Sequence, residues 1–333
     1  MPLCTPPQLI DLTTRALINA GASPSMAASA ARALVAADEQ GIPSHGVSRV
    51  PLYAGHLRNG RVVGTAVPRI AHERKAACLI DAGNGMAYSA CEMAVEEMTR
   101  RAREFGVAYV GVTNSNHFGM TSHHLEPMAA RGLVSLAFGN APSAMNAWGG
   151  TKPLFGTNPI AAAFPRVGKS PVIIDLSLSE VARGKLMVAA RDKKPIPLGW
   201  ALDKNGKPTT DPAEGLLGSM VPAGGVKGAM LAMVVELLVV SLTGAAFAFE
   251  ADSFFSETGN VMRLGHGFLA IDPGALAGDA TYAARLETLV EMMLQDADVR
   301  LPGARRFAAR DLAQRDGISI PDALHQQLVQ LAA

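Results

Sequence analysis

A serine and a histidine stand side by side at Ser44 and His45, and an arginine and a tyrosine follow at Arg49 and Tyr53. Residues four apart on a helix share one face, so the imidazole, the guanidinium and the phenol can converge. Histidine exchanges a proton near neutral pH, and arginine grips a planar carboxylate through two parallel hydrogen bonds. This set suits acid–base chemistry on a small carboxylic acid. The plainer alternative, a capping serine and a solvated arginine, stays open.

A second chemical signal is the stretch "NSNHFGMTSHH", residues 114–124, with three histidines. Zinc sites need ligands at fixed spacing with acidic or thiolate neighbours, whereas His123 and His124 are adjacent and point different ways. The backbone amides around Gly119 and the nearby hydroxyls instead suit a phosphate or a carboxamide. We therefore predict a polar loop that cradles a ligand, and no metal.

Two glycine-rich turns are candidates for nucleotide binding. Gly83-Asn84-Gly85 lies between a predicted strand and a predicted helix, as in a Rossmann unit. However, Tyr88 occupies the third glycine position, and the next strand ends in Asn114 rather than in the acid that holds a ribose. The sequence therefore favours an ordinary turn here.

The second turn, "PAGGVKGAM" at 222–230, places glycines and Lys227 at the start of an apolar helix. Its order is not that of a P-loop, yet a bare helix N-terminus beside a lysine attracts anions. The cluster "RLPGARR" at 300–306 can grip a nucleotide phosphate. A flexible turn and a solvated surface are the respective alternatives.

The length of 333 residues indicates about two domains, and the composition, with 33 glycines, is typical of a globular enzyme with many tight turns. Among 333 residues, 30 Lys and Arg balance 29 Asp and Glu, so no long-range field attracts nucleic acid or an anionic membrane. The three cysteines show no metal spacing, and no signal peptide is evident, so we expect free thiols in the cytoplasm. Glu236 interrupts the apolar segment 229–249, which we predict to be a buried core helix rather than a membrane span.

The chain divides into three zones. Residues 6–60 are predicted to be helical, with Pro51 imposing a kink or a restart near Ser48. Strands are expected within 76–82, 107–114, 133–140, 171–177 and 266–273. Residues 281–295 carry an apolar helical stripe of Leu286, Leu289, Val290, Met293 and Leu294, expected to bury against the N-terminal helices. The stretch 202–225 is expected to be the longest irregular loop and to be functional.

Five separated motifs resemble the malate/L-lactate dehydrogenase superfamily of the non-Rossmann type, over residues 8 to 310. They are "SHG" followed by Arg49, "NSNHFG", "LFGTNPIAAAFP" at 154–165, "IIDLSLSEVARGK" at 173–185 and the glycine–lysine–glycine turn. Residues 235–252 and "RLPGARR" look most like the branch that reduces Δ1-piperideine-2-carboxylate and Δ1-pyrroline-2-carboxylate. Ala229-Met230-Leu231 departs from the Tyr-Gly-Leu of many relatives and argues against the malate or lactate branch.

The resemblance implies an α/β, non-Rossmann fold. Its helical N-terminal part, residues 1–75, would pack with a helical C-terminal part, 276–333, beside a largely antiparallel-sheet cofactor and substrate domain at 76–275. It also implies an NADPH-dependent enzyme, with NADH possible, that is a homodimer and binds no nucleic acid or membrane. The apolar stripe at 281–295 offers more surface than one helical layer can bury, which also favours a homodimer.

The resemblance also implies residue roles. His45 would donate a proton, with Ser44 as its relay, and substrate would be held by Arg49, Tyr53, Thr157, Arg183 and Gly184. The cofactor would contact His117, Phe118, Gly119, Met120, Thr121, Asp175, Leu176, Ser177, Gly225, Lys227, Arg300, Leu301, Pro302, Gly303, Ala304, Arg305 and Arg306.

The expected activity is reduction of a cyclic imino acid to L-pipecolate or L-proline. The alternatives are a 2-hydroxy acid dehydrogenase of the malate or lactate type and, in another class, a non-catalytic nucleotide-binding protein.

Overall fold

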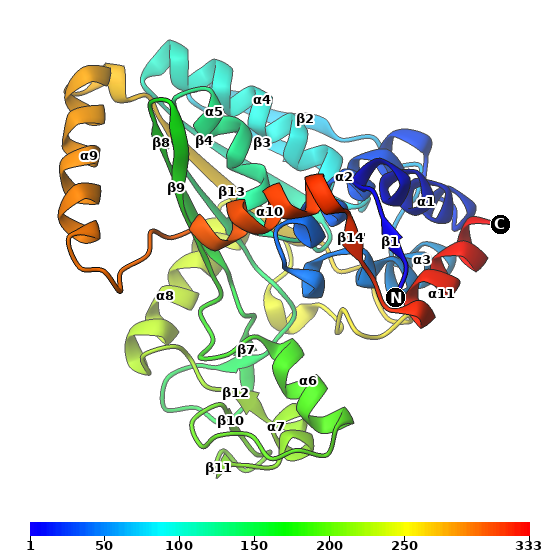
Figure 1. Ribbon diagram of the computed structural model, residues 1–333. Helices are drawn as coiled ribbons and strands as arrows, with labels where there is room; N and C mark the ends of the chain where they lie inside the picture. The colour runs from blue at the N-terminus through cyan, green and yellow to red at the C-terminus, as the bar shows by residue number, and fades with distance from the viewer.

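The computed structural model describes residues 1–333 as a helical layer, a large sheet and a smaller sheet (Figure 1). The helical layer begins with α1 (Pro6–Asn19) and α2 (Pro24–Glu39), whose first turns are capped by the side chains of Thr5 and Ser23. Prolines stand in both first turns, where the missing N–H has no partner to lose. The two helices, predicted from these signals, are confirmed.

The chain ends return to this layer. β1 (Leu3–Cys4) pairs with β14 (Ile318–Ser319), and α11 (Asp322–Ala332) packs on α1 while α10 (Ala304–Asp316) packs on α2. Figure 1 shows both termini at the same end of the molecule. The apolar face of α11 thereby joins the core of the N-terminal helices.

The restart expected near Ser48 is confirmed. Two single 3₁₀ turns, Pro43–His45 and Val47–Arg49, precede α3 (Val50–Arg58), and Pro51 lies in the first turn of that helix. His45, Arg49 and Tyr53 therefore do not share one continuous helix, and their convergence depends on how these turns pack.

The large sheet has seven strands in the order β2-β3-β4-β13-β5-β8-β9. They span β2 (Arg69–Arg74), β3 (Ala77–Asp81), β4 (Val107–Ser115), β13 (Leu264–Ile271), β5 (Val134–Gly139), β8 (Ile160–Arg166) and β9 (Lys169–Leu176). Only β3 and β4 are parallel, joined through α4 (Ala87–Phe105), and all other pairs are antiparallel. The predicted non-Rossmann, largely antiparallel α/β fold is confirmed, as are the five predicted strands. β2 lacks a predictive pattern because all its residues are exposed.

The smaller sheet occupies much of the stretch expected to be irregular. Its order is β11 (Pro208–Thr209), β10 (Ala201–Leu202), β12 (Ser219–Met220), β6 (Met145–Asn146) and β7 (Pro153–Phe155), with α6 (Arg183–Arg191) and α7 (Pro212–Leu217) beside it. The prediction of a long loop at 202–225 is wrong, because strands of two or three residues are too short to show an alternating pattern.

The apolar segment 229–249 is not a fully buried helix. α8 (Val226–Glu236) continues into a π-helical turn at Leu237–Ser241 and buries only one face. Met230, Leu231 and Val234 on the other face are 46%, 46% and 49% exposed, which corrects the prediction. Across the structure, no helix is long and apolar enough to cross a bilayer.

The expected packing of the stripe at 281–295 is also wrong. This segment forms α9 (Asp279–Leu294), which contacts β8 and stands away from the N-terminal helices (Figure 1). Of the stripe, only Val290 is buried, whereas Leu289 is 58% exposed. The place predicted for this helix, against the N-terminal layer, is taken by α10 and α11.

These outward faces of α8 and α9 are where we expect a second copy of the chain to bind. Leu231→Glu should shift a homodimer toward monomer in sedimentation velocity, because a charge replaces an apolar contact. Leu312→Glu, which changes an exposed leucine of α10, is the matched control and should leave the assembly unaltered. A wild-type chain that stays monomeric at tens of micromolar would contradict the expectation.

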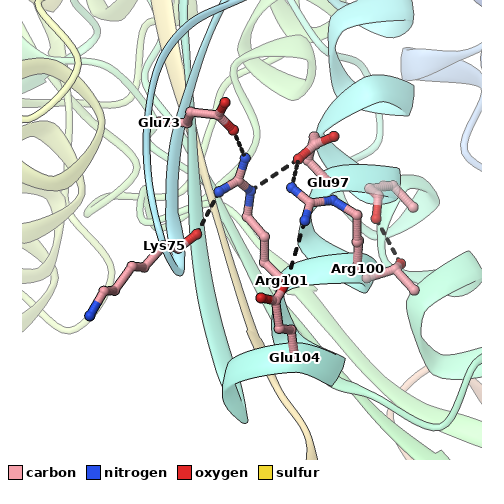
Figure 2. A network of polar contacts seen from close by, with 8 residues as sticks. Glu73, Lys75, Glu97, Arg100, Arg101 and Glu104 are labelled. Atoms are coloured by element: carbon pink, nitrogen blue, oxygen red, sulfur yellow. Dashed lines mark hydrogen bonds and ion pairs between the residues drawn. The ribbon is translucent and has the colours of Figure 1, made fainter.

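A buried arginine fastens the β2–β3 hairpin to α4 (Figure 2). The Arg101 side chain, 3% exposed, donates to Glu73 and to the Lys75 carbonyl on the hairpin. Its Nε lies 3.0 Å from Glu97 on its own helix, and Arg100 holds the same carboxylate at 2.9 Å. The pairing neutralises a buried charge that is costly to leave alone, so the edge of the sheet is held in register with α4.

The Gly83-Asn84-Gly85 turn packs against the helical layer. A Cβ on Gly85 would lie 2.9 Å from both Ala66 Cβ and Met26 Cε. We therefore expect Gly85→Ala to lower the free energy of unfolding by about 1–3 kcal/mol through overpacking, with little change in dinucleotide Kd. Urea denaturation and fluorescence titration measure the two quantities. A large rise in Kd at unchanged stability would restore the Rossmann interpretation.

Candidate active site

A cleft of about 1250 Å³ lies where the helical layer and the two sheets meet. Most of the predicted site residues line it: Ser44, His45, Arg49, His117, Phe118, Gly119, Met120, Thr121, Thr157, Asp175, Leu176, Ser177, Arg183, Gly184 and Arg306. These side chains come from segments more than 250 residues apart, and the fold brings them to one place.

Nine predicted residues do not line the cleft: Tyr53, Gly225, Lys227, Arg300, Leu301, Pro302, Gly303, Ala304 and Arg305. The turn at 300–305 instead packs on β9, where Ile173 N donates to the Pro302 carbonyl, and of this motif only Arg306 reaches the cleft. Gly225 lies near the Trp148 ring at the start of α8. In the single chain these residues of the two basic turns lie outside the cleft, and the cofactor contacts expected for them stay a prediction.

The two 3₁₀ turns present Ser44, His45 and Arg49 to the cleft. Ser44 Oγ lies 3.0 Å from His45 Nδ1, and Arg49 Nε donates to the Ser44 carbonyl at 2.7 Å. With Nδ1 occupied, His45 Nε2 is the ring nitrogen left for a ligand. The three residues are therefore held as one unit.

Asp38 of α2 fixes the break between these turns. Its Oδ2 accepts a hydrogen bond from Val47 N at 2.7 Å. A Cβ on Gly46 would lie 2.1 Å from the Asp38 carboxylate, so only glycine fits between the turns. Asp38 was not singled out from sequence, because nothing in the spacing of Asp38 and Val47 predicts this contact.

Tyr53 lies behind the cleft wall rather than in it. Its hydroxyl is 2.6 Å from His117 Nδ1 and 3.1 Å from the Tyr88 hydroxyl. The His117 ring in turn stacks on His45, with 5.5 Å between centroids. Tyr53 is thus placed to orient His117, and the substrate contact expected for Tyr53 stays a prediction.

Both cleft histidines are held neutral. Burial, and then the charge of Arg49, lower the pKa of His45 to about 4. Burial, followed by Arg49 and His45, lowers the pKa of His117 well below its usual value. A neutral imidazole accepts a proton, and an anion bound beside Arg49 would raise its pKa again. The pair is therefore electrostatically suited to respond to an anionic ligand.

The cleft is positively charged although the chain as a whole is nearly balanced. Six cationic side chains line it against two carboxylates, Asp175 and Asp192. Asp192 pairs with Arg191, while Asp175 Oδ2 accepts from Arg306 at 3.1 Å and from Ser122 N at 3.0 Å. The cationic excess therefore remains available for a bound anion.

Arg49 and Arg183 have no carboxylate partner. Arg49 donates to the Ser44 carbonyl through Nε alone. Its guanidinium lies over the Phe255 ring, 5.1 Å from the centroid. Burial lowers the pKa of Arg183, and no acid offsets it. Arg183 opens α6, whose first turn has no side-chain cap and lines the cleft, so backbone N–H groups without an intrahelical partner lie beside it. Both positions suit anionic groups.

Several cleft residues had not been predicted, among them Asn140, Lys185, Trp200, Phe254 and Phe255. Asn140 follows β5 and is buried, with Nδ2 donating to Glu236 and to the Ala246 carbonyl. The adjacent phenylalanines were the one available signal, since paired aromatics in a polar stretch are unusual. Asn140 and Trp200 stand in no recognisable pattern, and Lys185 ends the motif at 173–185 without having been singled out.

Beneath the 117–121 loop, His266 is fully buried and burial lowers its pKa to about 3. The unfolded chain, with an ordinary pKa of about 6.5, binds the proton first, so this contribution to stability is complete above pH 6.5 and is lost as the pH falls toward 3. We expect a loss of about 2 kcal/mol from this group between pH 7.5 and pH 5. Urea unfolding at both values measures it, and His266→Gln should flatten the dependence. If His266→Gln leaves the pH dependence of the free energy of unfolding unchanged, that dependence does not come from His266.

The sequence and the fold of the chain are similar to those of named enzymes. The chain is 47% identical over 298 residues to (2R)-3-sulfolactate dehydrogenase (NADP(+)) of Chromohalobacter salexigens, covering 90% of this chain and 88% of the relative. It is 38% identical over 327 residues to a Δ1-pyrroline-2-carboxylate/Δ1-piperideine-2-carboxylate reductase of Pseudomonas syringae pv. tomato, covering 98% and 95%. The crystal structure of Δ1-piperideine-2-carboxylate reductase from that organism superposes with a TM-score of 0.94 at 37% identity, covering 99% of this chain and 100% of that one.

The mainly antiparallel large sheet excludes a Rossmann fold, and the Ser44–His45 pair lines a cationic cleft. The family model described as malate/L-lactate dehydrogenase matches residues 4–329. The chain belongs to this family, as its five motifs predicted.

Proposed function

We propose that the protein is an NADP(H)-dependent dehydrogenase of a small 2-hydroxy acid that carries a second anionic group, of the 3-sulfolactate type. The observation that carries the proposal is the presence of two arginines without carboxylate partners, Arg49 and Arg183, in the cleft that holds His45. The relative that is 47% identical acts on such a substrate by its name. This differs from the cyclic imine expected from sequence.

Charge favours a dianion over an iminium. A cyclic imine is basic and tends to arrive protonated, which adds a positive ring nitrogen to a cleft already rich in cations. A 2-hydroxy acid with a sulfonate or second carboxylate instead supplies one negative group for Arg49 and one for Arg183 or the uncapped start of α6.

The site fits a phosphorylated dinucleotide. The 117–121 loop, Asp175–Ser177 and Arg306 lie together, joined by the Arg306–Ser122 and Arg306–Asp175 contacts at 2.8 and 3.1 Å. These residues would hold the cofactor, which accepts or supplies the hydride when bound. NADP(H) is the cofactor named for the relative of highest identity given above.

The chain's own groups then manage position and protons. Arg49 grips the carboxylate, which places the 2-hydroxyl near His45. In oxidation, neutral His45 takes the hydroxyl proton on Nε2 as the C–H hydride leaves carbon 2, which becomes a carbonyl carbon. Ser44 stabilises the imidazolium by accepting from Nδ1–H. In reduction the same proton returns to the oxygen.

Steady-state kinetics with a panel of substrates test the proposal. We expect kcat/KM for 3-sulfolactate or malate to exceed that for lactate by about 10- to 100-fold, since a buried charge-assisted contact contributes about 1.5–3 kcal/mol. Arg183→Met should remove most of this preference while leaving lactate turnover nearly unchanged. A kcat/KM for lactate equal to that for 3-sulfolactate and malate would overturn the proposal, and so would a lack of activity on every hydroxy acid.

Imine reduction is the second candidate, supported by the fit to the Pseudomonas syringae reductase at a TM-score of 0.94. The panel therefore includes Δ1-piperideine-2-carboxylate and Δ1-pyrroline-2-carboxylate with NADPH and NADH. A kcat/KM for either imine above that for every 2-oxo acid would favour this candidate.

A further inference from the structure

Residues 252–260 form a short loop beside the cleft, and hydrogen bonds join its first and last residues. Asp252 and Asn260 are joined reciprocally: Asn260 N donates to Asp252 Oδ2 at 2.7 Å, and Asp252 N donates to Asn260 Oδ1 at 3.0 Å. Between them Ser253 Oγ accepts from Phe255 N at 3.2 Å. We call residues 252–260 the aromatic loop. It contains no helix or strand, so its shape depends on these side chains.

The two phenylalanines of the aromatic loop contact the carboxylate anchor Arg49 and His117, the histidine that stacks on His45. The Phe254 ring meets the His117 ring edge-on, with centroids 4.8 Å apart. The Phe255 ring lies under the Arg49 guanidinium at 5.1 Å. Both rings line the cleft and are half-buried. They therefore form an apolar wall beside the carboxylate anchor.

A fully buried arginine holds the aromatic loop in place. Arg61, with no carboxylate partner, donates from Nε to the Asn260 carbonyl at 3.0 Å, from Nη1 to Ser253 at 3.0 Å and from Nη2 to Asp252 at 3.2 Å. Nη1 also reaches the Ser256 carbonyl at 2.5 Å. A guanidinium is the side chain that can donate in one plane to several carbonyls, so the loop conformation depends on it.

The helix that begins after Arg49 also supports the aromatic loop. His56 Nε2 donates to the Ser256 carbonyl at 2.9 Å, and Asn59 Nδ2 donates to the Glu257 carbonyl at 3.3 Å. A Cβ on Gly55 would lie 2.8 Å from the Glu257 side chain, so the loop sits directly on α3. One helix thus sets the distance between the carboxylate anchor and the apolar wall.

We propose that the aromatic loop is the specificity element of the substrate site. Phe254 and Phe255 limit the size and polarity of the group attached to carbon 2 of the substrate, and Arg61 is the positioning residue that holds them there. This rests on the proposed function in so far as the substrates are 2-hydroxy and 2-oxo acids anchored by Arg49.

Two physical effects follow from the Phe255 contact. The ring keeps water from one face of Arg49, so its ion pair with a carboxylate forms at lower local dielectric and is stronger. The ring also fills volume next to the anchored carbon, so a larger substituent clashes. Removing it should therefore raise KM for small acids and admit larger ones.

The test compares Phe254→Ala and Phe255→Ala with Phe249→Ala, an exposed phenylalanine stacked on Phe247 outside the cleft. For the best wild-type substrate we expect KM to rise about tenfold in Phe255→Ala, with a smaller change in kcat. For 2-oxo-4-phenylbutyrate, kcat/KM relative to that substrate should rise at least tenfold in one of the two cleft variants. Phe249→Ala should match wild type.

Arg61→Lys and Asn260→Ala extend the test to positioning. Arg61→Lys should shift the substrate ranking in the same direction as the phenylalanine variants. Asn260→Ala removes a hydrogen bond of the loop without changing a buried residue. It therefore tests whether the loop conformation sets the substrate ranking even if Arg61→Lys fails to fold. A substrate ranking within twofold of wild type in both phenylalanine variants and in Asn260→Ala would overturn the inference. Failure of the proposed function is a separate result, because wild type itself would then turn over no hydroxy or oxo acid.

Discussion

Replacing His45 by alanine is expected to lower kcat by about two to four orders of magnitude, the usual contribution of a positioned acid or base, while dinucleotide still binds. His45 is joined to Ser44 at Nδ1 and offers Nε2 to the cleft. Because burial and Arg49 lower its pKa to about 4, the free enzyme holds it neutral, which is the form that accepts a proton in oxidation.

The pH profile sharpens this prediction. For oxidation by wild type, kcat/KM should lose nothing through His45 between pH 6 and pH 9, because kcat/KM reports the free enzyme, in which this group is already deprotonated. Reduction consumes a proton, so its kcat should fall as the pH rises above the pKa that His45 acquires with the anionic substrate bound. Initial rates in both directions across this range, with wild type and His45→Ala, make the comparison.

His117 is the rival proton carrier and supplies the control. It stacks on His45, but its Nδ1 is occupied by Tyr53. Tyr53→Phe should change kcat by less than about tenfold if His117 only supports the site. Should His45→Ala keep near-wild-type turnover on both 2-oxo acids and imines while His117→Ala does not, the proton carrier is His117 and our assignment is wrong.

Arg49→Lys is expected to reduce kcat/KM by about 100-fold, and Arg49→Ala by more, although a positive charge survives in the first variant. A lysine ammonium cannot donate two parallel hydrogen bonds to a carboxylate. It also loses the Nε bond to the Ser44 carbonyl and the contact with Phe255. The loss should appear in KM and, because the clamp orients the reacting carbon, also in kcat.

Arg58→Lys is the matched control for this variant. Arg58 is the last residue of α3, the helix that begins directly after Arg49, and it is exposed and does not line the cleft. Its kinetics should equal those of wild type, which separates the role of the clamp from a general effect of lost arginine. Equal kcat/KM for Arg49→Lys and wild type would show that the substrate carboxylate binds elsewhere, with Arg183 the next candidate.

Much of the framework is determined by local sequence. The capping serine and threonine, the prolines in first turns and the β-branched runs each act within a few residues, so α1, α2 and the five predicted strands follow from them. The restart before α3 follows from Pro51 alone. The motifs around His45, His117 and Asp175 identified the family, and the cleft contains all three.

The tertiary structure decided what these local signals leave open. A glycine turn at a helix N-terminus attracts anions wherever it lies, so Gly225 and Lys227 looked like a cofactor site, yet they lie outside the cleft of this chain. An apolar stripe shows that a helix has a face to bury but not its partner, so α9 was assigned to a surface that α10 and α11 occupy. Packing of distant segments alone decides such partners.

The composition of the cleft beyond its motifs was also decided by packing. Asp38 under Gly46, Tyr53 behind His117 and Arg61 under the aromatic loop act through single contacts between segments that carry no shared pattern. The periodicity of apolar residues shows which face of a helix or strand is buried. It does not show which distant segment packs on that face, and these contacts depend on that packing. The sequence by itself therefore determined the main helices and strands, the family and the candidate reactive residues, and the tertiary structure determined which neighbours contact them.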